Sequence, residues 1–106
     1  MASFTDREKI KEIAFKYAEL LKKEMYIKRV YLFGSYAKGT DTEDSDIDII
    51  VVGDNFSDDL IEDTFKLMKI RRRVDNRIEP HPFKSSDFNL SNPFVREILN
   101  TSIRII

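Results

Sequence analysis

Two short motifs in this sequence of 106 residues carry side chains that could do chemistry, and ten residues separate them. Gly34 and Ser35 form the first motif, and Asp46 and Asp48 belong to the second. A turn with glycine can present successive backbone N–H groups to a phosphate, and the Ser35 hydroxyl can donate one more hydrogen bond. Residues i and i+2 of a strand point to the same face, so a strand beginning at Asp46 brings both carboxylates together.

The carboxylate pair predicts a bound cation. Like charges held close together repel, so a stable fold favours a cation between Asp46 and Asp48. Hard oxygen ligands suit Mg²⁺ or Mn²⁺ better than zinc. A phosphate-binding turn beside such a pair indicates metal-assisted phosphoryl or nucleotidyl transfer.

These motifs resemble the signature of the nucleotidyltransferase superfamily that includes DNA polymerase beta. That signature is Gly-Ser, ten intervening residues and then Asp-x-Asp, and the sequence matches it at Gly34, Ser35, Asp46 and Asp48. The match is tight from position 32 to position 52, and the whole chain follows the superfamily's element order more loosely. Its specificity is high because the motif, the strand placement and the apolar flanks agree.

The resemblance implies roles for individual residues. Asp46 and Asp48 would hold two Mg²⁺ ions, with Mn²⁺ as the alternative metal, and a third carboxylate on a neighbouring strand would complete the metal site. Glu79 is our candidate for this ligand and for the acceptor of a proton, and Asp75 is the runner-up.

The same resemblance places the β- and γ-phosphates of the nucleotide at Gly34 and Ser35. Lys38 and His81 each allow two interpretations. Lys38 either meets the triphosphate or is a solvated loop lysine, and His81 is either a helper at the site or a histidine packed at a sheet edge. The arginines at positions 71–73 either end a helix or bind triphosphate, RNA or a partner.

The chain looks like the minimal nucleotidyltransferases (MNT) of bacteria and archaea, many of which are antitoxins of HEPN/MNT toxin–antitoxin modules. This resemblance implies transfer of AMP from ATP to a tyrosine of a HEPN-family toxin. One alternative is a non-catalytic antitoxin that occludes a HEPN ribonuclease by binding it. The other is transfer to a small-molecule acceptor, with a homodimer building the acceptor pocket.

The amino-acid composition limits the classes of function and partner. The formal net charge is −1, with 18 basic and 19 acidic residues, so strong nucleic-acid binding is not expected. Cysteine is absent, which excludes disulfides and thiolate metal sites and suits a cytoplasmic protein. No stretch approaches the roughly 20 apolar residues that span a bilayer, so no membrane partner is expected.

Hydrophobic periodicity and turn residues predict one nucleotidyltransferase domain over residues 1–106 with an α/β (α+β), polymerase-beta-like fold. A small mixed sheet would be packed with helices. The third predicted strand contains two prolines and should therefore lie at a sheet edge or leave the ladder early. The predicted elements are a helix over about 5–25 capped by Thr5, strands over 29–33, 46–52 and 77–83, a helix from a Ser57 cap to about 71, a helix over 93–99, and a strand or packed tail over 101–106.

Overall fold

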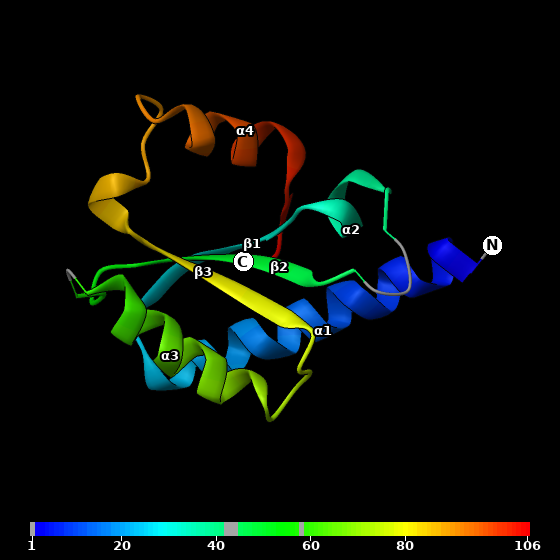
Figure 1. Cartoon of the computed structure of the whole chain (residues 1–106), viewed down its shortest axis with the longest axis horizontal. Helices are drawn as coiled ribbons and strands as arrows, with labels where there is room; N and C mark the ends of the chain where they lie inside the picture. The colour runs from blue at the N-terminus through cyan, green and yellow to red at the C-terminus, as the bar shows by residue number, and fades with distance from the viewer. Residues whose placement is uncertain (1, 42–44, 58) are drawn as a thin grey trace.

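The computed structural model describes the backbone of residues 2–41, 45–57 and 59–106, and their side chains except at positions 2–6 and 60. A four-stranded mixed sheet with the order β3-β2-β1-β4 forms the centre of the fold (Figure 1). Strand β1 pairs antiparallel with β2 and β4, whereas β2 and β3 are parallel. The four strands are β1 (Ile27–Phe33), β2 (Ile47–Gly53), β3 (Ile78–Lys84) and β4 (Ile103–Arg104).

Helices cover both faces of this sheet. Figure 1 shows α1 (Ala2–Glu24) and α3 (Leu60–Arg71) on one face and α4 (Pro93–Thr101) on the other. The short helix α2 (Ser35–Lys38) follows β1 directly, and a 3-10 turn (Ser85–Asp87) follows β3. The α/β (α+β) prediction is therefore confirmed. None of the helices in the described part combines the length and hydropathy needed to cross a bilayer.

The main hydrophobic core lies between the sheet and the pair α1 and α3. Alternate residues of the strands point into it, as the period of two in a strand requires. Tyr17 of α1 contributes a fully buried ring, and its hydroxyl donates a hydrogen bond of 2.6 Å to the Leu67 carbonyl of α3. Burial raises the pKa of the Tyr17 phenol. Other members of this core are Leu21, Val30, Leu32, Ile47, Ile49, Val51 and Ile78.

A second, smaller core lies under α4 on the opposite face. Tyr31, Ile50, Val52 and Ile98 are buried there. Strand β2 thus buries side chains on both faces, which is why its sequence is a continuous apolar run rather than an alternating one.

Strand β3 lies at the edge of the sheet, as its prolines predict. The Ile47 N–H donates to the Arg77 carbonyl at 2.9 Å, so in the parallel ladder the odd-numbered residues of β3 bond to β2. The backbone groups of the even-numbered positions, including Pro80 and Pro82, then point to the open edge of the sheet. Since proline has no N–H, this edge offers few donors to an added strand.

Several predicted boundaries were wrong by a few residues. Helix α1 begins at Ala2 rather than Thr5, whose side chain lies outside the described set. Strand β2 begins at Ile47, so Asp46 precedes the strand instead of opening it. The tail does form a strand, because Ile103 pairs with Leu32 of β1.

The predicted cap of the second helix was also wrong. Asp59, not Ser57, is the N-cap of α3, because its carboxylate accepts from the N–H groups of Ile61 and Glu62. The Ser57 hydroxyl instead bonds to Asp63, at 3.3 Å. Asp58, the residue after Ser57, lies outside the described residues.

Replacing Tyr17 by Phe tests the tie between α1 and α3. The loss of a buried hydrogen bond should lower the free energy of unfolding by about 1 kcal/mol, measured by urea denaturation. Tyr26→Phe is the matched control, because Tyr26 is 73% exposed and should change stability by less than about 0.5 kcal/mol. Equal values for the two variants would show that the Tyr17 hydroxyl bond contributes nothing.

Candidate active site

Gly34 joins β1 to α2 in a conformation that suits glycine. Its φ of 76° lies in the left-handed region, and a Cβ at this position would clash with Oδ2 of Asp48. The register explains this contact, because Phe33 and Asp48 are paired residues of β1 and β2. The Gly34 backbone therefore packs directly against one carboxylate of the second motif.

Two predicted metal ligands face each other across the parallel strands. Asp48 of β2 and Glu79 of β3 are register partners, so their side chains share one face of the sheet. Asp46 lies one residue before β2 and is hydrogen-bonded to Glu79. The bond to Asp46 raises the pKa of the Glu79 carboxyl, and burial and the negative charges of Asp46 and Asp48 raise it further.

His81 also lies at this cluster. Its Nε2 is 3.2 Å from Oδ1 of Asp48, and it follows Glu79 by two residues on the same strand face. When Asp48 is ionised, an Nε2–H donates to it. Both interpretations of His81 therefore apply, because this histidine lies on the edge strand and also contacts Asp48, a candidate metal ligand.

These side chains form two pairs rather than one closed cage. Asp46 pairs with Glu79, and Asp48 pairs with His81. Within residues 2–41, 45–57 and 59–106, no group of three or more His, Asp or Glu side chains surrounds a point that could hold a metal ion. The donor chemistry still fits a hard divalent cation, because the carboxylates of Asp46, Asp48 and Glu79 lie on or directly before neighbouring strands.

The remaining predicted residues have partners of their own. Asp75 accepts hydrogen bonds from the Arg77 side chain at 2.9 and 3.1 Å, which hold its pKa below the usual range. It precedes β3 and is paired with Arg77, whereas Glu79 is the register partner of Asp48. The Lys38 amine lies 3.6 Å from Glu97 and above the Phe33 ring, which ties α2 to α4. Ser35 is half-buried as the first residue of α2.

The sequence analysis missed an aromatic wall beside the carboxylates. The rings of Phe33 and Phe94 meet edge to face at 5.6 Å, and Phe83 lies 5.9 Å from Phe94. Phe33 and Phe83 share the sheet face of Asp48 and Glu79, because they occupy matching positions in the strand alternation. The period of two was the available signal for these residues, whereas the approach of Phe94 depends on how α4 packs.

Comparison with protein families supports the same chemistry. The family described as "Polymerase beta, Nucleotidyltransferase" matches residues 8–106. A proposed protein adenylyltransferase of Methanocaldococcus jannaschii is 55% identical over 42 residues, which cover 40% of this chain and only 42% of that relative. Another from the same organism is 29% identical over 96 residues, which cover 89% of this chain and 91% of the relative.

Solved structures show the same fold. A proposed nucleotidyltransferase from Sulfolobus solfataricus superimposes with a TM-score of 0.72 at 16% identity, covering 98% of this chain and 86% of that one. A toxin–antitoxin structure with AMP-PNP gives a TM-score of 0.57 at 22% identity, covering 84% of this chain and 68% of the other. At these identities the likeness concerns the fold.

Replacing Gly34 by Ala should destabilise the protein more than replacing Gly39. Both glycines have positive φ, of 76° and 78°, but a Cβ at Gly39 meets nothing within 4 Å. Backbone strain should cost about 1 kcal/mol in each variant, and the clash with Asp48 should add about 1–3 kcal/mol only in Gly34→Ala. Urea denaturation measures the difference, which should shrink when Asp48→Ala is added. Equal losses would contradict the packing of Gly34 on Asp48.

The raised pKa of Glu79 can be measured by NMR titration of its side-chain carboxyl in metal-free protein. Asp46→Asn should move this pKa down towards the ordinary range, because it removes the charged hydrogen-bond partner. Because folding raises this pKa, the carboxyl stabilises the fold at low pH, and this contribution is lost as pH rises through the folded-state pKa. Millimolar Mg²⁺ should also lower this pKa, and no response to Mg²⁺ would contradict metal binding by Glu79.

Proposed function

Because the chain belongs to the polymerase beta nucleotidyltransferase family, we propose that it transfers AMP from ATP to a protein acceptor. The observation that carries this proposal is the gathering of Asp46, Asp48 and Glu79 beside the Gly34 turn. A phosphate-binding turn and a set of hard oxygen ligands are the two parts that nucleotidyl transfer needs. We treat residues 1–106 as one nucleotidyltransferase domain.

Each residue has a distinct task in this proposal. The backbone of Gly34 and the hydroxyl of Ser35 hold the β- and γ-phosphates, and Lys38 contributes positive charge near them. Asp46, Asp48 and Glu79 bind Mg²⁺, which would neutralise charge on the triphosphate during transfer. His81 fixes the orientation of Asp48 through their contact of 3.2 Å.

The transfer exchanges a phosphoanhydride bond of ATP for a phosphoester bond to the acceptor. The acceptor oxygen attacks the α-phosphorus in line with the bond to the bridging oxygen of the β-phosphate. The new oxygen–phosphorus bond forms as the old one breaks, and pyrophosphate leaves on the side of Gly34 and Ser35. The proton of the acceptor hydroxyl passes to the Glu79 carboxylate, which is the outermost of the three carboxyl groups across the sheet.

We further propose that the acceptor is a tyrosine of a HEPN-family toxin and that this chain is its MNT antitoxin. Two comparisons support this. A toxin–antitoxin structure with AMP-PNP shares the fold, and the named relatives are proposed protein adenylyltransferases. The competing candidate is an antitoxin that acts by binding alone, which the paired, uncaged arrangement of the described carboxylates favours.

The test is to incubate the purified protein with Mg²⁺, each α-labelled NTP and a candidate HEPN-family toxin, and to weigh that toxin by intact mass. The acceptor should gain one nucleoside monophosphate, and AMP should be the preferred group. Asp46→Asn, Asp48→Asn and Glu79→Gln should each lower the rate on the order of 100-fold or more.

Asp75→Asn is the matched control, because it removes a carboxylate that the structure pairs with Arg77. Its rate should stay near that of the wild type. A stable complex with no mass gain would contradict the enzyme hypothesis and support an antitoxin that acts by binding alone. Loss of activity in Asp75→Asn but not in Glu79→Gln would exchange their roles.

A further inference from the structure

Helix α3 exposes a stripe of apolar side chains on the side away from the core. Ile61 is 72% exposed and Phe65 is 62% exposed, and Met68 continues the same face at helical spacing. We call Ile61, Phe65 and Met68 the α3 stripe. The core-facing side of α3 buries Leu67 and Ile70, so Ile61 and Phe65 point away from the core. A shallow cavity of about 310 Å³ lies along it, lined by the stripe and Thr64.

The α3 stripe runs into a groove that reaches the carboxylates. This groove has a volume of about 430 Å³ and wraps over the open edge of β3, and we call it the β3 groove. Thr64 and Met68 line both hollows, so the two surfaces are continuous. Its lining residues are Thr64, Met68 and Arg71 from α3, residues 79–83 from β3, and Phe94 from α4.

The order of the strands indicates which reactant enters by the β3 groove. The phosphate turn at Gly34 follows β1, Asp48 is on β2, and Glu79 is on β3, so these groups are arranged in line across the sheet towards the open edge. In an in-line displacement the attacking oxygen enters opposite the leaving group. If pyrophosphate leaves over Gly34, the acceptor must approach from the β3 edge, where the groove opens.

The chemistry of the β3 groove favours a flat, largely apolar side chain that ends in a hydroxyl. Pro82, Phe83 and Phe94 provide apolar and aromatic surface, and Glu79 also lines the groove. An aromatic ring can pack on such surface while its hydroxyl reaches a carboxylate. An added β-strand suits this edge poorly, because Pro80 and Pro82 cannot donate backbone hydrogen bonds to it.

We propose that the α3 stripe and the β3 groove form one docking surface for a protein acceptor. The partner covers the stripe with an apolar face of its own and places a tyrosine side chain in the groove. Met68 lines the groove, and Ile61 lies seven residues from it along α3, a distance of roughly 10 Å. A small acceptor bound at Glu79 would therefore not reach Ile61. The ion pair between Glu62 and Lys66 flanks the stripe and gives it the polar rim of a protein interface. This inference rests on the proposed function.

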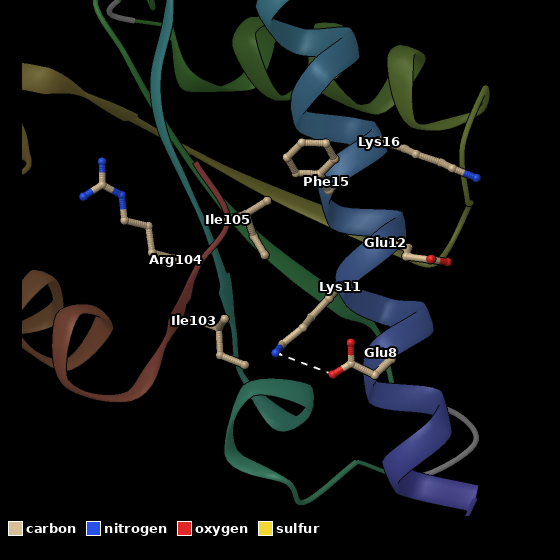
Figure 2. A pocket seen from close by; sticks show the side chains of 8 residues that line it. All are labelled: Glu8, Lys11, Glu12, Phe15, Lys16, Ile103, Arg104 and Ile105. Atoms are coloured by element: carbon tan, nitrogen blue, oxygen red, sulfur yellow. Dashed lines mark ion pairs between the residues drawn. The ribbon is translucent and has the colours of Figure 1, made fainter.

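The docking surface is tested with Phe65→Glu, which places a charge in the middle of the stripe. Phe15→Glu is the matched control, because Phe15 is 47% exposed and lines a groove between α1 and β4 at the opposite edge of the sheet (Figure 2). The affinity of each variant for the HEPN-family protein is measured by calorimetry without nucleotide. Phe65→Glu should bind about 10–30-fold more weakly than the wild type, and Phe15→Glu should bind as the wild type does.

Mg²⁺·ATP binding to each variant is measured alongside, because it tests the nucleotide site separately. Normal ATP affinity with weakened partner binding in Phe65→Glu alone supports the docking surface. Unchanged partner binding in Phe65→Glu overturns it, as does a wild-type self-association that Phe65→Glu abolishes, which would make the stripe a contact between two copies. Absence of ATP binding in the wild type would instead refute the proposed function, and partner affinities would still decide the docking surface.

Discussion

The candidate site depends on the alignment of two parallel strands. Because Asp48 and Glu79 are register partners, one carboxylate faces the other across a single strand spacing. A shift of one residue would turn every side chain of β3 to the opposite face and would move Glu79 into the core beneath the sheet. The hydrogen bond with Asp46, together with burial and the negative charges of Asp46 and Asp48, raises the pKa of Glu79.

Packing on both faces holds this register. Ile47 and Ile78 are paired and fully buried against α1 and α3, and their neighbours Asp48 and Glu79 therefore point to the other face. On that face α4 covers the sheet only in part, through Ile98 and the aromatic contacts of Phe94. The apolar interior thus positions the polar groups, and the limited cover by α4 leaves them accessible.

The open edge of β3 links the site to the surface of α3. Arg71 donates a hydrogen bond of 2.8 Å to the Ile78 carbonyl, which fastens the end of α3 to the start of β3. Pro80 and Pro82 then reduce the capacity of this edge to pair with another strand. An edge built in this way can stay exposed beside a reactive site without inviting aggregation, and it leaves side chains as the means of contact.

The sequence alone was sufficient for the elements that depend on local periodicity and on spacing. The strands around Leu32 and Ile49, the edge position of β3 and the approach of Asp48 to the Gly34 turn follow from alternation, glycine and proline. Helix ends were less accurate because capping depends on which carboxylate reaches the backbone, and Asp59 rather than Ser57 does so.

Only the tertiary structure decided the contacts between distant segments. It brought His81 to Asp48 and Phe94 to Phe33. It also joined the α3 stripe to the β3 groove. These contacts depend on the parallel register and on the packing of helices against the sheet, and no local pattern encodes either, because many chain segments must be placed together before any of these side chains meet.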